Sequence, residues 1–357
     1  MSDRTWQLCY STSCVMLVFV FITSAFSQSK CASSAVQLKP AGQASDYGIL
    51  RSSDNGGTWT KVVNDSGAIQ AMAEVSSGRV FAGTSGALQG PRMQLGLLRS
   101  EDEGNRWTRS SVCPDGTDLS DMRSILSLTD GHLLAGSGRG VFRSDDHGET
   151  WTRMNRGLPE GAGSNVQSLT ANGQGVFFAA TYDGIVRWEK NGTWMPAGLK
   201  GVPVNVLVAS SKGTLLAGSA QKGMYRSTDR GTTWKPISVV PGRVWVSTLL
   251  TDSKGHLYAG VADHGVYRSD DDGISWRRLQ IPGKKPQVYA LAASGRGEFY
   301  AAIGDCCPVQ KVSLLRSADS GSTWRAILEV READVAIGSV IVTRSGTLLV
   351  GLNSVGD

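Results

Sequence analysis

The sequence predicts an all-β protein made of seven repeats of four strands each, and three observations support this. First, a nine-residue phrase that ends in tryptophan occurs along most of the chain. Second, an apolar phrase typical of a buried strand occurs equally often. Third, 44 of the 357 residues are glycine, well above the typical ~7 %. Frequent glycine without a collagen period indicates many tight turns, as in an all-β chain.

The first phrase, the repeat turn, reads Arg51-Ser-Ser-Asp54-Asn-Gly56-Gly-Thr58-Trp59 in its first copy. Its aspartate can accept backbone N–H bonds, its glycine tolerates positive φ, and its tryptophan can bury a large apolar area. We therefore predict a hairpin turn whose tryptophan packs between neighbouring sheets. Good copies follow at 99–107, 143–151, 226–234, 268–276 and 316–324, and a copy without the serine and aspartate lies at 187–194. The residues predicted to be structural are Asp54, Asp102, Asp146, Asp229, Asp271 and Asp319, with Trp59, Trp107, Trp151, Trp194, Trp234, Trp276 and Trp324.

The second phrase has the form Gly-x-apolar-apolar followed by two small residues. An apolar stretch precedes each copy, so each repeat holds four strands in ~40–50 residues, the period of a propeller blade. The first repeat turn has no inner strands before it, and the last inner pair has no repeat turn after it. We therefore predict a single seven-bladed β-propeller whose closing blade combines N-terminal and C-terminal strands. The seven copies start at Gly78, Gly131, Gly175, Gly213, Gly255, Gly297 and Gly346.

Three segments are expected along the chain: a signal peptide at 1–27, a linker at 28–45 and the propeller at 46–357. The apolar run Val15–Ile22 is followed by small residues that end at Ser27. This run is shorter than the ~20 residues that a bilayer span needs, so it resembles a cleaved export signal. We expect a secreted or periplasmic protein, with no membrane span in the mature chain. An uncleaved N-terminal anchor is the alternative.

The charge pattern argues against nucleic-acid binding. The net charge is only +5, and no run of Lys or Arg exceeds two residues, whereas nucleic-acid binders carry a basic stripe with stacking aromatics. No cofactor or metal is expected, because adjacent cysteines such as Cys306-Cys307 are poorly placed to chelate one zinc ion. We expect a monomer. After loss of the leader four cysteines remain, and they allow three disulfide pairings that the sequence does not distinguish: Cys31, Cys113, Cys306 and Cys307.

The repeat turn resembles the Asp-box, or bacterial neuraminidase repeat, with the pattern Ser-x-Asp-x-Gly-x-Thr-Trp. This resemblance implies a propeller of the sialidase-like superfamily, with each box between the third and fourth strands of a blade. It also implies that the boxes are structural, because ligands of such propellers bind on the opposite face. The chain is further similar to the photosystem II assembly factor family, exported single propellers of seven blades that act as protein-binding scaffolds.

The predicted ligand face, the loop face, carries the loops between blades and between second and third strands. Two of these loops are long, at 84–96 and 304–311, and long loops on a rigid scaffold often carry function. Trp245 has two interpretations, and a core position between blades is favoured over a platform that stacks on a sugar ring. The inner strands are expected to contribute Gln70, Arg123, Gln167, Asn205, Trp245 and Tyr289 to the channel. The ligand-face candidates are Arg92, Arg123, Arg139, Asp183, Trp245, Asp263, His264, Tyr289 and Asp305.

Enzymatic functions receive little support from the motifs. Resemblance to sialidases would imply six blades and an Arg-Ile-Pro phrase. This chain predicts seven blades and has no Arg-Ile-Pro phrase. Xyloglucan-cleaving relatives use one aspartate from each of two propellers, whereas this chain predicts one propeller. We therefore expect an exported, non-catalytic scaffold that binds a protein or a glycan on its loop face. The alternative is a glycoside hydrolase, sialidase-like or xyloglucanase-like, for which no catalytic residues can be named.

Overall fold

The computed structural model describes most of the predicted propeller. The described residues are 31–32, 47–64, 67–85, 96–110, 119, 121–128, 131–240, 242, 244–305, 311–331 and 335–354. The predicted signal peptide and most of the predicted linker lie outside them. Within the described residues, no helix has the length and apolar character needed to cross a membrane.

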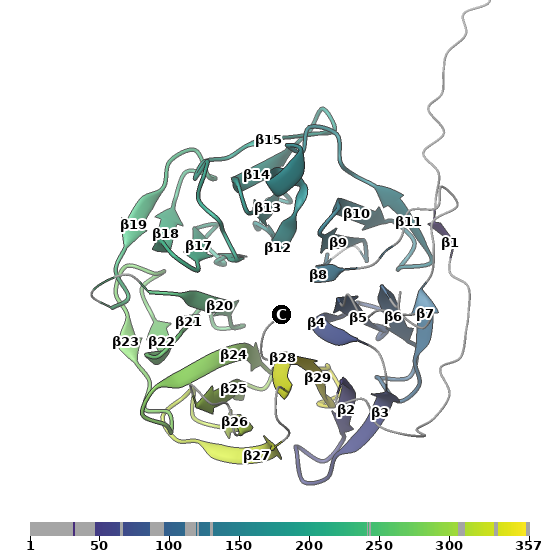
Figure 1. Cartoon of the computed structure of the whole chain (residues 1–357), viewed down its shortest axis with the longest axis vertical. Helices are drawn as coiled ribbons and strands as arrows, with labels where there is room; N and C mark the ends of the chain where they lie inside the picture. Colours follow the sequence, from purple (N-terminus) through teal and green to yellow (C-terminus); the bar gives the residue numbers. More distant parts are fainter. Residues whose placement is uncertain are drawn as a thin grey trace, which may run out of the picture.

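Seven antiparallel blades of four strands surround a central axis, which confirms the predicted seven-bladed β-propeller (Figure 1). A two-residue strand, β1 (Cys31–Ala32), adds a fifth strand to the outer edge of blade 3. Blade 2 consists of β4 (Ala68–Glu74), β5 (Val80–Ser85), β6 (Leu97–Ser100) and β7 (Thr108–Ser110). Blade 3 consists of β8 (Met122–Ser127), β9 (Leu133–Ser137), β10 (Gly140–Ser144) and β11 (Thr150–Arg153). Blade 4 follows a short 3-10 helix, η1 (Gly161–Ser164), and consists of β12 (Val166–Ala171), β13 (Phe177–Thr181), β14 (Gly184–Glu189) and β15 (Thr193–Pro196).

The remaining blades repeat this order from the channel outward. Blade 5 consists of β16 (Val206–Ala209), β17 (Leu215–Ser219), β18 (Gly223–Ser227) and β19 (Lys235–Ile237). Blade 6 consists of β20 (Val246–Thr251), β21 (Leu257–Val261), β22 (Gly265–Ser269) and β23 (Arg277–Arg278). Blade 7 consists of β24 (Pro286–Ala293), β25 (Phe299–Asp305), β26 (Val312–Ser317) and β27 (Arg325–Val330).

The closing blade, blade 1, joins the two ends of the chain as predicted. Its inner strands are β28 (Val335–Val342) and β29 (Leu348–Ser354), and its outer strands are β2 (Gly48–Ser52) and β3 (Thr60–Asn64). In Figure 1 the yellow C-terminal strands lie beside the purple N-terminal ones. Arg344 strengthens the seam to blade 2, since its backbone N–H donates to the carboxylate of Glu74 at 2.8 Å. The ring is therefore closed by strand pairing between distant parts of the sequence.

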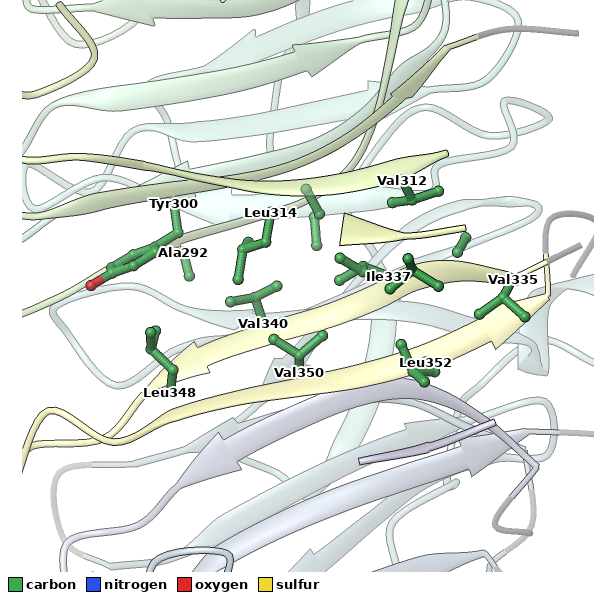
Figure 2. Packing of buried hydrophobic residues seen from close by; sticks show 14 residues of the cluster. Ala292, Tyr300, Val312, Leu314, Val335, Ile337, Val340, Leu348, Val350 and Leu352 are labelled. Atoms are coloured by element: carbon green, nitrogen blue, oxygen red, sulfur yellow. The ribbon is translucent and has the colours of Figure 1, made fainter. Parts of the chain in front are cut away.

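Apolar clusters between neighbouring blades form the core. The cluster in Figure 2 joins blade 7 to the closing blade: Tyr300 and Leu314 face Val340 and Val350, and all four side chains are buried. The small residue at the end of the second repeated phrase permits this close approach. A Cβ atom added at Gly351, for example, would lie 2.3 Å from Cγ2 of Ile69 on the next blade.

The repeat turns share one hydrogen-bond pattern in their six complete copies. In the first copy, the hydroxyl of Ser52 donates to Asp54 at 2.7 Å and accepts the N–H of Gly56 at 2.9 Å. The same carboxylate accepts the N–H and the hydroxyl of Thr58, at 2.9 and 2.7 Å. Asn55, between Asp54 and Gly56, has φ 59°. The serine is buried in all six copies, so it connects the aspartate, which is exposed or half-buried, to the body of the blade.

The tryptophans of the repeat turns are buried to different degrees. Trp107, Trp151 and Trp194 are at most 4 % exposed, whereas Trp59, Trp234, Trp276 and Trp324 are half-buried. Several reach across a seam between blades: the indole N–H of Trp194 donates to the carbonyl of Met154 at 2.6 Å.

The arginine that begins each repeat turn often bonds to the next blade. Nε of Arg51 donates to the carbonyl of Glu103 at 3.2 Å, and Nε of Arg226 donates to the carbonyl of Asp272 at 2.9 Å. Each of these acceptors belongs to the positive-φ residue of the following repeat turn. Arg187 and Arg268 make equivalent bonds. The motif therefore stabilises contacts between blades as well as its own turn.

Acid is expected to destabilise the propeller between about pH 4 and pH 2. Hydrogen bonds, chiefly from the residue four positions later, lower the pKa of Asp54, Asp229, Asp271 and Asp319 to about 2. An aspartate in the unfolded chain has a pKa of ~3.9, so the unfolded chain takes up protons first as the pH falls. The stabilisation is therefore complete above about pH 4 and is lost as the pH drops through the folded pKa.

The measurement is the melting temperature from pH 6 to pH 2. Replacing these four aspartates together by asparagine is expected to lower the melting temperature at pH 6 and to flatten its fall in acid. Replacing the exposed Asp145 by asparagine is the control. An unchanged acid slope in the fourfold variant would contradict the assignment.

Candidate functional site

A recurring β-bulge places one residue of each inner strand at the channel. In six of the seven blades the register between the first and second strands shifts by one residue near the start of the inner strand. In blade 5, Asn205 has the corresponding position, directly before Val206, which pairs with Gly218. Such a bulge leaves one residue out of the ladder and redirects its side chain. The seven residues are Gln70, Arg123, Gln167, Asn205, Ser247, Tyr289 and Gly338, and all of them line the central cavity.

The central cavity has a volume of about 1000 Å³, at the upper end of the ~300–1000 Å³ typical of small-molecule sites. Its walls come from the inner strands of all seven blades, together with Tyr182 from the turn between β13 and β14. Serine hydroxyls and side-chain amides make up much of the lining. The site is therefore a polar, open cavity on the axis of a rigid ring.

One charged pair lies at the cavity. Nε and Nη2 of Arg123 donate to the two carboxylate oxygens of Asp121 at 3.0 and 2.9 Å. Nη1 donates to the amide oxygen of Asn165 at 3.2 Å, and the amide of Gln167 donates to the same oxygen at 2.5 Å. Burial alone would lower the pKa of Arg123, but the contact with Asp121 outweighs it and raises the pKa. This network holds Arg123 in one position and compensates its charge.

Aromatic side chains lie on the wall beyond this pair. Trp245 is 52 % exposed and Tyr182 is 41 % exposed, and both line the cavity together with Tyr289. The favoured interpretation of Trp245, a core position between blades, is therefore wrong. Trp245 directly precedes β20 rather than lying within a strand, so the packing between blades does not cover its indole.

Asn205 lies on the blade between the two blades that carry the exposed aromatic side chains, and the oxygen of its amide has no hydrogen-bond partner among the described residues. Asn205 belongs to blade 5, whereas Tyr182 and Trp245 belong to blades 4 and 6. Its Oδ1 atom is buried and has no hydrogen-bond partner among the described residues. A buried acceptor without a partner is costly, so such a group is a reasonable contact for a ligand donor.

Four other predicted candidates lie on loop-face turns but do not line the cavity. The carboxylate of Asp183 accepts a backbone N–H at 3.1 Å, and that of Asp263 accepts the amide of Gln287 at 2.7 Å. His264 contacts a carbonyl two residues before it at 2.8 Å. Arg139 is exposed on the turn between β9 and β10. The contacts of Asp183, Asp263 and His264 hold these loops in place.

Two candidates cannot be placed with their side chains. Arg92 lies outside the described residues, and of Asp305 only its backbone position at the end of β25 is described. Most of the two long loops, at 86–95 and 306–310, and Cys113 lie outside the described residues as well. Across the described residues, no cluster of three or more His, Cys, Asp or Glu side chains could hold a metal ion.

Several residues at the site were neither among the ligand-face candidates nor among the predicted channel residues, including Asp121, Asn165, Tyr182 and Ser247. Asp121 and Asn165 directly precede the inner strands β8 and β12, so alignment of the seven strand starts would have found them. Tyr182 occupies a two-residue turn that looks structural in the sequence. Its exposure depends on how that turn points, which the sequence pattern does not reveal.

Comparison with known proteins identifies the fold. Residues 103–244 match the family described as DUF6242 beta propeller domain. No curated protein matches the chain. Among solved structures, YCF48 bound to D1 peptide is similar with a TM-score of 0.61 and 17% identity over 89% of this chain and 99% of that chain.

Two longer proteins contain a similar propeller. The extracellular domain of the two-component system BT4673 from B. thetaiotaomicron has a TM-score of 0.57, with 12% identity over 81% of this chain and 38% of that chain. The GH74 xyloglucanase from Xanthomonas campestris has a TM-score of 0.52, with 19% identity over 62% of this chain and 40% of that chain. The chain thus spans about two-fifths of the length of each, and the common feature is a β-propeller.

Proposed function

We propose that this chain is an exported, non-catalytic propeller of the Asp-box type that binds its ligand at the loop-face mouth of the central cavity. The observation that carries the proposal is the combination of Trp245, half exposed on the cavity wall, with hydrogen-bonding side chains that the starts of six inner strands present to the cavity. Exposed aromatic groups beside a few fixed polar groups are typical of ligand sites. The Asp-box assignment rests on the six equivalent turns.

The charged groups of the cavity support binding rather than hydrolysis. Among the described lining residues Asp121 is the one carboxylate, and both of its oxygens accept bonds from Arg123. Glycoside hydrolysis generally needs two carboxylates on either side of the bond that is cleaved. The extracellular domain of BT4673 and the YCF48 complex are examples of the same fold in an extracellular domain and in peptide binding.

Replacing Trp245 by alanine is expected to weaken ligand binding about tenfold or more, because truncating a central aromatic anchor typically costs over ~1–2 kcal/mol. Ligands are first found by screening the full-length protein against a glycan array and a displayed peptide library. Affinities of the wild type and the variant are then compared by calorimetry. Replacing Ile274 by alanine is the matched control, since Ile274 is 70 % exposed on a repeat turn at the opposite face.

Two results would contradict the proposal. Binding that survives loss of Trp245 but is weakened by loss of Ile274 would place the site on the other face. Turnover of fluorogenic glycosides that disappears in the Asp121→Asn variant would show a glycoside hydrolase instead.

A further inference from the structure

We propose that the cavity mouth binds an uncharged carbohydrate, a neutral sugar or the neutral end of a glycan, and this inference rests on the proposed binding function. Three features of the described cavity support it: its compensated charge, its arrangement of hydrogen-bonding groups and its two exposed aromatic faces.

The charge of the cavity matches a neutral ligand. Asp121 and Arg123 are the charged side chains among the described lining residues, and they pair with each other. The third nitrogen of the guanidinium donates to Asn165. A carboxylate or phosphate on a ligand would have to displace Asp121 from Arg123. The net electrostatic attraction between this site and an anionic ligand is therefore small.

The hydrogen-bonding groups match a ligand with many hydroxyls. Gln167 of blade 4 and Asn205 of blade 5 present amides to the cavity, and Thr248 of blade 6 adds a hydroxyl. The hydroxyls of Ser168 and Ser247 also line the cavity, but they already bond to backbone groups of the next blade. Amides and hydroxyls both donate and accept, as sugar hydroxyls do. The buried Oδ1 of Asn205 has no partner among the described residues, and a rotation of this amide toward the cavity that it lines would let it accept from a ligand hydroxyl. Gly338 on the closing blade has no side chain, so the opposite wall offers fewer contacts.

The aromatic groups provide the apolar part of the recognition. Sugar rings have an apolar face of C–H groups, and the faces of Trp and Tyr rings are electron-rich and polarizable. Tyr182 and Trp245 lie on either side of blade 5, which carries Asn205. A sugar seated against blade 5 would contact an aromatic group and the amide acceptor together. A docked protein segment would instead favour an apolar anchor pocket, and the lining here is mainly polar.

The test compares matched neutral and anionic probes on the full-length protein. The neutral probes are lactose, cellotetraose and xylotetraose, the anionic probes are sialyllactose and oligogalacturonate, and a displayed peptide library represents proteins. We expect a neutral probe to bind with a dissociation constant that changes less than twofold between 50 and 500 mM NaCl. The Trp245→Ala variant should lose at least tenfold in affinity, whereas Ile274→Ala should lose none.

The Asp121→Asn variant gives a second, opposite readout. Asp121 has φ 58°, a conformation that asparagine also tolerates, so the backbone should be unchanged. Loss of the carboxylate leaves the charge of Arg123 uncompensated. The variant is therefore expected to gain at least fivefold in affinity for sialyllactose at 50 mM NaCl and to lose this gain at 500 mM.

The possible failures are distinguishable. Trp245-dependent binding of an anionic glycan or a peptide, with no neutral sugar bound, would overturn the neutral-carbohydrate inference and leave the binding function standing. A sialyllactose affinity that does not rise in Asp121→Asn would also overturn it, because it would show that Arg123 does not act on the ligand site. Absence of any bound glycan or peptide, or binding that ignores Trp245, would overturn both proposals.

Discussion

Truncation of the chain after Asp334 is expected to abolish folding, because it removes both inner strands of the closing blade. The lost strands β28 and β29 bury Val335, Ile337, Val340, Leu348, Val350 and Leu352. Burying one such side chain contributes ~1.5–3 kcal/mol, so the loss is on the order of 10 kcal/mol. Domains of this kind are stable by only ~5–15 kcal/mol in total. The free energy lost on truncation is therefore as large as the free energy of unfolding of the whole ring.

Circular dichroism and thermal melting of the truncated chain check this prediction. The control is a circular permutant in which residues 335–357 precede residue 46 and the chain ends at residue 334. It keeps all four strands of each of the seven blades and connects β29 directly to β2, which are already paired. The permutant is expected to melt cooperatively. A truncated chain that keeps a native β spectrum and a cooperative transition would show that strand pairing across the termini is not needed.

The second large effect is expected for Trp194→Ala, at about 3–5 kcal/mol of lost stability. The indole is fully buried, lies 5.3 Å from the ring of Trp188 and donates to the carbonyl of Met154. Its removal leaves a large cavity at the seam between blades 3 and 4 and an unpaired carbonyl. Denaturant unfolding measures the loss of free energy.

A matched variant tests whether the loss of stability depends on how deeply the tryptophan is buried or only on its position in the repeat turn. Trp59 occupies the equivalent position in the closing blade, is half-buried and donates to the carbonyl of Ile327 at 2.9 Å. Trp59→Ala is therefore expected to cost clearly less than Trp194→Ala. Equal losses in the two variants would mean that the turns, not the packing of the indoles, determine the stability.

The fold could be predicted because both repeated phrases have direct physical causes. The turn phrase places a buried serine, an aspartate and a glycine in one hydrogen-bonded hairpin, so its spacing reports the blade period. The unequal ends of the repeat series predicted the shared closing blade. The role of the first arginine, as in the bond from Arg226 to the next turn, was missed because it depends on the distance between blades.

The candidate site was less predictable, because its side chains are placed by backbone irregularities. Arg123 and Tyr289 were found from their position on inner strands, and the structure adds the bulges that bring them to the cavity. Trp245 could not be separated from the core tryptophans, since residue type alone does not report exposure. The charge balance of the cavity also depends on a pairing between Asp121 and Arg123 that composition does not reveal.

The outermost strands of the blades bear on how the protein avoids aggregation. Closing the ring pairs the N-terminal strand β2 with the C-terminal strand β29, but each blade still presents an outer edge whose backbone groups could pair with another molecule. In blades 5 and 6 that edge is short and basic: β19 has three residues beginning with Lys235, and β23 is Arg277–Arg278. Short, charged edge strands discourage pairing between molecules. In blade 3 the two-residue strand β1 (Cys31–Ala32) pairs with the outer strand β11, so part of that edge is occupied by the chain itself.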